Sequence, residues 1–244
     1  MKKINLIVII LFCSVVRIWA QEKNHIPFPM LGEDAPSFAA ESTSGTLNFP
    51  ADYTAKWKIL FSHPADFTPV CTTELLELAA SQKDFEKHGA TIIVVSVDPV
   101  ETHLEWKKNM ETLKYKDRDP VKIDFPLVSD HNLVISKKYG MIQSATSSTK
   151  DVRGVFIVDP KDKIRAMFFY PMNVGRNLAE IERTLIALQT ADKQQVLIPA
   201  NWEPGGDVLI PYVKSTAEAE KLATRDNPDY YEISWYMKFK KGVK

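Results

Sequence analysis

Cys71 is the residue of this sequence that is best placed to do chemistry, because of where it lies. An apolar, strand-like stretch at 57–61 comes before it. After it, side chains suited to a buried face recur every three or four positions, as in a helix; they are Leu75, Leu78, Ala79, Gln82 and Phe85. A thiol at a strand-to-helix junction faces the positive end of the helix dipole and the unpaired N–H groups of the first turn. Both favour the thiolate, which is the nucleophilic form of cysteine.

The only other cysteine, Cys13, lies in a segment that is typical of a secretory signal peptide. The chain has a basic start, then an almost wholly apolar run at 4–16, and then a small residue, Ala20, at a cleavage position. We therefore predict that residues 1–20 are a signal peptide. The mature protein is then exported, either to a periplasm or out of the cell.

Two other interpretations of this segment are disfavoured. A membrane anchor needs roughly 20 apolar residues, whereas this run is shorter and Arg17 interrupts it. A lipid anchor on Cys13 lacks the small residues expected before a lipidated cysteine. We therefore expect no stable membrane insertion once the signal peptide has been cleaved.

Cleavage would leave Cys71 as a lone cysteine, which excludes an intramolecular disulfide. A lone cysteine can simply be a small buried apolar residue. The neighbours of Cys71 argue against that interpretation, because Pro64, Thr68, Pro69 and Thr72 are polar or turn-forming rather than core-like. The composition around Cys71 therefore favours a reactive thiol.

Strands and helices alternate along the chain after the 57–61 strand. The expected elements are a helix from Thr72, a strand at 91–97, a helix at 100–113, a strand at 125–129, a helix at 132–139, strands at 155–159 and 164–170, and a helix at 177–191. In the helix at 100–113, the expected apolar residues are Leu104, Trp106 and Met110. The order β-α-β-α-β-α-β-β-α predicts a layered α/β domain.

The character of the chain changes from Leu197 onward, where prolines and glycines separate short extended pieces. A helix is expected at 215–225 and a solvated basic tail at 238–244. We predict a main domain at 26–191 and a smaller module at 192–244. The module has more aromatic side chains than so short a segment can bury, and such density is typical of an interface; they are Trp202, Tyr212, Tyr230, Tyr231, Trp235, Tyr236 and Phe239.

Several classes of function find no support in the composition. The 31 basic and 31 acidic residues balance, and the basic ones do not cluster, so a nucleic-acid partner is not expected. No glycine-rich phosphate loop is present, and the five histidines lack the spacing of metal ligands. We therefore expect no cofactor and no metal.

The segment SHPADFTPVCTTE at 62–74 resembles the active-site signature of one-cysteine peroxiredoxins, the type with an extra C-terminal domain. Weaker matches to the family's other motifs lie at 31–38, 96–98, 153–160, 170–177 and 201–202. The resemblance covers roughly residue 26 to the end of the chain. It implies a thioredoxin-like fold, with a central mixed sheet flanked by helices, plus a small C-terminal α+β module. It also implies a homodimer in which this module packs near the partner's active site.

The resemblance implies catalytic roles for Cys71, Thr68, Arg153 and Pro64. The Cys71 thiolate attacks the peroxide and becomes a sulfenic acid. Thr68 lies three residues before Cys71, so its hydroxyl is expected to reach the sulfur and the peroxide, although threonine before proline is also a common turn residue. Arg153 is expected to donate hydrogen bonds to both. Pro64 is expected to wall the pocket and keep water from the sulfur.

Three further residues are expected to support this site. Glu74 and Arg176 match a pair that holds the active-site arginine in place. His63 matches a histidine that commonly lies close to the sulfur in this subtype. Two interpretations of His63 stay open, namely a packed imidazole and a participant in proton exchange.

The resulting hypothesis is a thiol-dependent peroxidase that reduces hydrogen peroxide and organic hydroperoxides. With no second cysteine in the mature chain, an external and unidentified thiol must regenerate Cys71. A thiol–disulfide oxidoreductase is the first alternative, but it usually needs Cys-x-x-Cys, and 72–74 holds no second sulfur. A redox-regulated holdase is the second alternative, which fold alone does not exclude.

Phospholipase activity, which some animal members combine with a Gly-x-Ser-x-Gly run before the strand, is not supported. The corresponding stretch here is 54–58, where Lys56 stands in place of the serine and both glycines are missing. A serine nucleophile needs its tight glycine-flanked turn.

Overall fold

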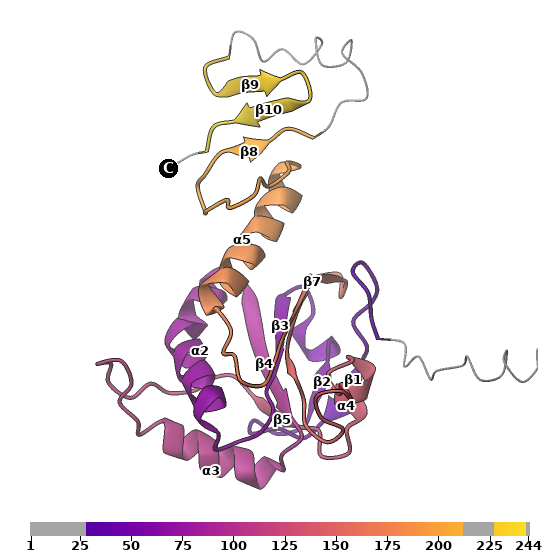
Figure 1. Ribbon diagram of the computed structural model, residues 1–244, viewed down its shortest axis with the longest axis vertical. Helices are drawn as coiled ribbons and strands as arrows, with labels where there is room; N and C mark the ends of the chain where they lie inside the picture. The colour runs from indigo at the N-terminus through magenta and orange to yellow at the C-terminus, as the bar shows by residue number, and fades with distance from the viewer. Residues whose placement is uncertain (1–27, 212–226, 243–244) are drawn as a thin grey trace, which may run out of the picture.

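A five-stranded mixed sheet lies at the centre of the protein (Figure 1). The computed structural model describes residues 28–211 and 227–242. The strand order is β5 (Leu127–Ser129), β4 (Ala90–Ser96), β3 (Trp57–Ser62), β6 (Arg153–Val158) and β7 (Ile164–Tyr170). The central strand β3 runs parallel to β4 and antiparallel to β6. Because β3 is buried along its whole length, its apolar composition is that of a strand covered on both faces.

Successive side chains of β3 point to opposite faces of the sheet, and each face has its own core. Ile59 and Phe61 pack with residues of α2 (Pro69–Lys87), α3 (Val100–Met110) and α5 (Leu178–Gln194). Leu60 packs on the other face, with α4 (Val134–Lys138) and the hairpin of β1 (Phe38–Ala40) and β2 (Leu47–Phe49). A short 3₁₀ helix, η1 (Ala51–Tyr53), follows that hairpin. The sheet therefore lies between two layers (Figure 1).

The expected thioredoxin-like α/β fold and its order of elements are confirmed, with three differences in detail. The strands β1 and β2 were not predicted, because three residues each are too few to show an alternating pattern. Helix α2 begins at Pro69 rather than Thr72, since proline fits the first position of a helix. In α3, Trp106 and Met110 are buried, but Leu104 is 47% exposed and His103 takes its place on the buried face, so the prediction was wrong for Leu104 alone.

The C-terminal part of the chain forms a separate antiparallel sheet beyond the end of α5 (Figure 1). Its order is β8 (Val208–Leu209), β10 (Met237–Lys240) and β9 (Tyr230–Ser234). A small core joins it to α5, formed by Ala187, Val196, Trp202 and Val208. The predicted helix at 215–225, Tyr212, Cys13 and the signal segment at 1–20 lie outside the described residues.

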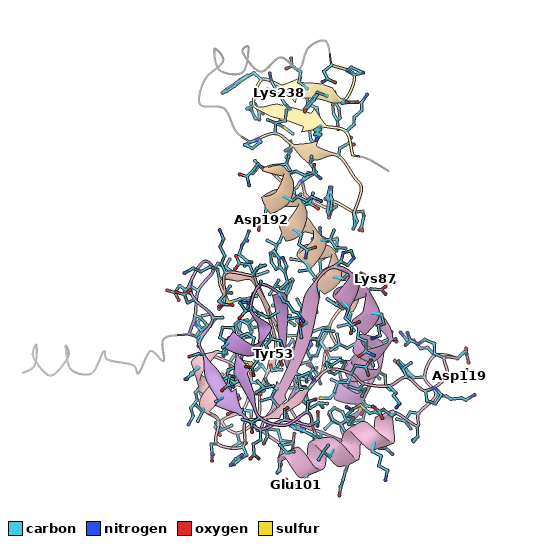
Figure 2. The ribbon with its side chains drawn as sticks, turned by 180° about the vertical axis from the view of Figure 1, so that it is seen from behind. Tyr53, Lys87, Glu101, Asp119, Asp192 and Lys238 are labelled. Atoms are coloured by element: carbon cyan, nitrogen blue, oxygen red, sulfur yellow. The ribbon has the colours of Figure 1, made fainter. Side chains whose placement is uncertain are left out.

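The predicted basic tail is wrong in one respect. Residues 238–240 belong to β10, and Lys238 is only 7% exposed because the strand pairs with β9. Figure 2 shows Lys238 within this small sheet and Asp192 on the helix between the two sheets. In the part of the chain that the structure describes, no helix is both long and apolar enough to span a bilayer.

Candidate active site

The start of helix α2 positions Cys71. Thr68 is the N-cap, with extended backbone angles, and Pro69 is the first helical residue. The Thr68 carbonyl accepts the first helical hydrogen bond, from the Thr72 N–H at 2.9 Å. Cys71 is therefore in the first turn, where N–H groups have no carbonyl partner within the helix. These N–H groups and the helix dipole make the surroundings of the sulfur favourable for negative charge.

Arg153 reaches Cys71 from the neighbouring strand. It is the first residue of β6, which pairs with β3, and its Nη1 lies 3.3 Å from the Cys71 Sγ. Its Nε donates to the Met172 carbonyl at 3.0 Å, which orients the guanidinium. Cys71 is 0% exposed and Arg153 is 2% exposed. The thiol and its cationic neighbour therefore share a site from which bulk water is excluded.

Glu74 links the two active-site arginines. Its Oε2 accepts hydrogen bonds from Arg153 Nη1 at 2.6 Å and from Arg176 Nη2 at 2.7 Å. Its Oε1 accepts from Arg176 Nε at 2.8 Å, so the Arg176 contact is a two-point fork. Glu74 lies one helical turn after Cys71, which brings the carboxylate beside Arg153. The expected pairing of Glu74 with both arginines is thus present in the geometry.

Arg176 also ties the strands to helix α2. Its Nη1 donates to the carbonyls of Ser62 at 2.7 Å and Gly154 at 2.8 Å. Its guanidinium carbon lies 3.3 Å from the centre of the Phe61 ring, in a cation–π contact. Arg176 therefore connects β3 and β6 to the helix that carries Cys71.

The charges of these groups are set by competing effects. Burial opposes ionisation of Glu74, but hydrogen bonds and charge from Arg176, with a contribution from Arg153, outweigh it and hold the pKa of Glu74 below its usual range. Burial lowers the pKa of Arg176, although Glu74 opposes that effect. The result at neutral pH is one buried carboxylate between two guanidinium groups.

His63 lies at the end of β3 in a separate network of buried polar groups. Its Nε2 is 2.8 Å from Asp66 Oδ1, and Asp66 Oδ2 is 2.7 Å from His103 Nδ1. His103 Nε2 lies 3.2 Å from the Val128 carbonyl. Both rings are fully buried. Burial lowers the pKa of His63, and the hydrogen bond and charge of Asp66 only partly oppose this.

Thr68 and Pro64 lie in the loop between β3 and α2. The Thr68 hydroxyl donates to the Ala65 carbonyl at 2.9 Å, which leaves its oxygen free to accept. Pro64 is buried. Phe67 has a left-handed backbone (φ 53°), which is uncommon for an aromatic residue and marks a strained point just before the helix.

The structure thus brings Cys71, Glu74, Arg153 and Arg176 into one cluster, whereas the Thr68 hydroxyl donates to the Ala65 carbonyl. It differs from expectation in how deeply it buries Cys71, since the sequence suggested polar and turn-forming surroundings. The reason is the earlier start of α2, which turns Cys71 toward the sheet and its apolar core.

Sequence reasoning gave no role to three residues in this region. Asp66 and His103 form the network with His63, and Asp98 Oδ2 accepts from the Asp66 N–H at 2.9 Å. His103 could have been found from its spacing, because it lies three and seven residues before Trp106 and Met110 on one helical face.

Carboxylate and imidazole atoms come closest to a metal-like arrangement at His63, Asp66 and Asp98. Within the described ranges this is the one such group, and its potential ligand atoms lie within 4.8 Å of one another. Hydrogen bonds already engage these residues, including one from the Ser96 hydroxyl to Asp98 Oδ2 at 2.8 Å. The group is therefore a hydrogen-bonded cluster that holds the loop between β3 and α2.

A thiol in the first turn of a helix, in contact with a buried arginine and mounted on a thioredoxin-like fold, defines a thiol peroxidase. Comparison with known proteins agrees with this class. The AhpC/TSA family matches residues 31–167, and the C-terminal domain of 1-Cys peroxiredoxin matches residues 187–224. The chain belongs to the peroxiredoxin family.

Individual relatives cover nearly the same length. A peroxiredoxin of Methanosarcina mazei is 44% identical over 216 residues, which are 88% of this chain and 99% of the relative. A solved structure of the yeast mitochondrial 1-Cys peroxiredoxin is 38% identical, with a TM-score of 0.76, and covers 88% of this chain and 100% of that one. A cysteine-to-serine mutant of peroxiredoxin 6 from Arenicola marina is 32% identical, also with a TM-score of 0.76, and covers 88% and 99%.

Proposed function

We propose that the protein reduces hydrogen peroxide and organic hydroperoxides, with Cys71 as its only peroxidatic residue. The observation that supports this most directly is the 3.3 Å contact between Arg153 Nη1 and the Cys71 sulfur. Glu74 and Arg176 hold that arginine in place. The arrangement offers a nucleophile and fixed hydrogen-bond donors in a site shielded from water, which is what peroxide cleavage requires.

The reaction has two stages. The thiolate attacks one peroxide oxygen, so that an S–O bond forms and the O–O bond breaks. The sulfur is oxidised to a sulfenic acid, and the departing oxygen takes up a proton to give water or an alcohol. Arg153 and the N–H groups at the start of α2 donate to the negative charge that develops on the oxygens. Thr68 and Pro64 shape the space in which the peroxide lies.

Regeneration uses thiols from outside the chain. One external thiol attacks the sulfenic acid, which releases water and leaves a mixed disulfide on Cys71. A second thiol then attacks that disulfide and restores the Cys71 thiolate. Cys71 is the one cysteine among residues 28–211 and 227–242, and it is free. An internal disulfide exchange cycle therefore has no second thiol to use in this region.

Access to the sulfur needs movement in this proposal, because Cys71 is fully covered. The loop at 64–68 is the segment beside it that can open, and the strained backbone at Phe67 makes it a natural hinge. Opening of the loop admits the peroxide. Closure then places Arg153 and the N–H groups at the start of α2 within hydrogen-bond distance of it.

We also infer that the protein acts outside the cytosol, with residues 1–20 removed as a signal peptide, and that it works as a homodimer. The basic start and apolar run of the segment support the first inference. The exposed aromatic residues of the small sheet support the second. The mass of the protein purified from its native compartment reports the cleavage site.

Peroxide consumption with a small dithiol as reductant tests the role of Cys71. The variant Cys71→Ser is expected to stay folded and to lose activity by several orders of magnitude, because serine is a poor nucleophile toward O–O bonds. In the uncleaved precursor, Cys13→Ser is the matched control and is expected to keep full activity. Substantial turnover by Cys71→Ser would exclude the proposed nucleophile.

Mass spectrometry tests the one-cysteine cycle. Excess peroxide without reductant is expected to add two and then three oxygens to the Cys71 peptide, because the mature chain has no second thiol to capture the sulfenic acid. On non-reducing gels the oxidised protein is expected to run as a monomer. A disulfide between two Cys71 residues, or between Cys13 and Cys71, as the main product contradicts the cycle.

A further inference from the structure

Asp151 is the one buried side chain of the loop at 142–151, which lies between α4 and β6. The loop is closed at its base, where the Val152 N–H donates to the Met141 carbonyl at 2.9 Å. Residues 142–150 are exposed or half-buried, and hydrogen bonds within the loop connect several of them with one another. Asp151 itself is 0% exposed. The side chain that holds this loop against the interior is therefore that of Asp151.

The groups around Asp151 suit a neutral carboxyl rather than a carboxylate. The Ser136 hydroxyl of α4 faces it, but the hydrogen of that hydroxyl goes to Asp130 Oδ2 at 2.6 Å. Asp130 also accepts from three backbone N–H groups at the start of α4. Among the residues that the structure describes, neither oxygen of Asp151 has a donor at ordinary hydrogen-bond geometry, and the charges that act on it are those of Asp130 and Asp98. A neutral Asp151 can give its own hydrogen to the Ser136 oxygen, whereas a charged one would be a buried anion beside two other acids.

Ionisation of Asp151 therefore requires movement. Burial raises the pKa of Asp151 to about 8 against a weaker contribution from the Ser136 hydroxyl, and the neighbouring acids add to the rise. At higher pH the carboxyl gives its proton to water, and the resulting anion needs solvent. The loop is the part that moves at least cost, because its other residues are already exposed or half-buried. The hydrogen bond between Val152 and Met141 at the base of the loop then breaks.

The loop ends two residues before Arg153, at the start of β6. Backbone pairing between β3 and β6 begins only at Val155. Before that point a side chain joins the two strands, since the Ser62 hydroxyl donates to the Val152 carbonyl at 2.7 Å and accepts from the Gly154 N–H at 2.9 Å. On the other side of β6 lies β7, which is an edge strand of the sheet. Movement of Val152 therefore breaks the contact with Ser62 and shifts Arg153.

We propose that neutral Asp151 is a positioning residue for Arg153: its buried carboxyl holds the loop at 142–151 against α4, and loss of its proton opens the loop and moves Arg153 away from Cys71. The effect on activity rests on the proposed peroxidase function, whereas the opening of the loop does not. Opening breaks no covalent bond, since the carboxyl only gives a proton to water and takes one back. The protein therefore loses activity in mildly alkaline solution and regains it at neutral pH.

Hydrogen exchange of peptides that cover 142–152, measured by mass spectrometry on the intact protein, tests the opening of the loop. Asp151→Asn is the comparison, because the amide keeps the size of the neutral carboxyl and does not ionise. At about pH 9, one unit above the folded pKa, ionised Asp151 outnumbers neutral Asp151 about tenfold. The wild-type loop is then expected to exchange at least about tenfold faster than the variant, and at about pH 6 the two should agree. Equal exchange at pH 9 overturns the proposal.

The rate of Cys71 oxidation by hydrogen peroxide tests the positioning role. Comparison of wild type with Asp151→Asn at equal pH removes the effect that pH has on the thiol itself. The two rates should agree at about pH 6, and the wild-type rate should be about tenfold lower at about pH 9 and recover when the protein is returned to pH 7. Asp119→Asn is the control, because it removes a carboxylate that is 88% exposed in another loop (Figure 2). Its exchange and its pH profile should match those of wild type.

The outcomes separate this inference from the proposed function. A wild-type loop that opens at pH 9 while Cys71 is oxidised as fast as in Asp151→Asn refutes the positioning role. If Asp151→Asn does not fold, NMR of the wild-type protein decides: protection of the Val152 N–H from exchange that stays constant between about pH 6 and 9 refutes the proposal. A wild-type protein without peroxidase activity refutes the proposed function, and its hydrogen exchange still tests the opening of the loop.

Discussion

The central domain and the small C-terminal sheet differ in which side chains they bury and which they expose. In the central domain even the charged residues of the site are inside, with Glu74 4% and Arg176 7% exposed, and they pair with one another. In the small sheet apolar side chains face outward, with Ile233 68%, Tyr236 54% and Trp235 43% exposed. Figure 2 shows side chains filling the central domain, while the sheet around Lys238 has little interior. Contacts among the described residues complete the first region, whereas the second keeps large apolar side chains on its surface.

The largest expected effect comes from breaking the charge cluster of the central domain. Glu74→Gln removes the carboxylate between Arg153 and Arg176, which leaves two buried cations beside each other. The free energy of unfolding should fall by about 3–5 kcal/mol, as for other broken buried pairs. Peroxidase activity should fall about a hundredfold, because Arg153 loses its anchor. Denaturant unfolding and initial rates measure both effects.

The control for Glu74→Gln is Glu86→Gln on the same helix, where the carboxylate pairs with Lys83 in solvent. Its effect should stay within about 0.5 kcal/mol. Because the pKa of Glu74 is lowered in the folded protein, its stabilising effect is present above the usual carboxylate pKa and is lost as the pH falls through the folded value. The difference in free energy of unfolding between wild type and Glu74→Gln should therefore become smaller in acid. A difference that stays constant contradicts this prediction.

Asp151 is a buried acidic residue of the central domain that, unlike Glu74, has no paired cation in the described part of the chain. Its carboxyl is fully buried, and neither oxygen makes a hydrogen bond of ordinary geometry among the described residues. Burial raises its pKa to about 8, against a weaker contribution from the Ser136 hydroxyl, and the charges of Asp130 and Asp98 add to the rise. The folded protein therefore holds a proton on Asp151 at neutral pH that the unfolded chain releases.

The predicted consequence is a fall in stability with rising pH. Between about pH 4 and 8 the unfolded chain binds fewer protons than the folded one, so Asp151 lowers the free energy of unfolding by up to about 1.4 kcal/mol per pH unit. Asp151→Asn should abolish this slope and be more stable than wild type at pH 8. The two proteins should converge below about pH 4. Denaturant titrations at several pH values give the free energy of unfolding of each protein. The same dependence on pH for wild type and Asp151→Asn counts against the prediction.

The exposed aromatic turn between β9 and β10 leads to a prediction about assembly. Replacing Trp235 and Tyr236 by serine should weaken self-association at least about tenfold, because aromatic side chains dominate interface energetics. The unfolding of the central domain should not change. Light scattering at micromolar concentration measures the oligomer. Val134→Ser on α4, 52% exposed in the central domain, is the control and should leave assembly intact. A monomeric wild-type protein refutes the prediction.

The smallest effect is expected where the two regions are joined. Arg165 on β7 holds Asp192 near the end of α5 through two hydrogen bonds, of 2.6 and 2.8 Å. Arg165→Lys loses the fork but keeps the charge, so the free energy of unfolding should fall by no more than about 1 kcal/mol. Activity should be unchanged. A large loss of activity would mean that this junction, and not only the cluster around Cys71, sets the geometry of the site.

The order of elements could be predicted from the sequence because long apolar runs and helical spacing carry that information locally. The hairpin of β1 and β2 could not, since its residues acquire their pattern only from pairing with each other. The cluster around Cys71 was reached through motif resemblance. The burial of Cys71 and the role of His103 were missed, because both depend on how α2 and α3 pack against the end of β3.

The position of Cys71 along the chain has a consequence during protein synthesis. The thiol emerges from the ribosome early, whereas Arg153 follows 82 positions later, and Arg176 comes 102 positions after Glu74. At about 5–20 residues per second, the cysteine exists for several seconds before either arginine has been made. A nascent chain therefore carries an ordinary thiol rather than an activated one. The Cys71 thiol becomes reactive toward peroxide only in the completed fold. Peroxide therefore oxidises this thiol slowly while the protein is still being made.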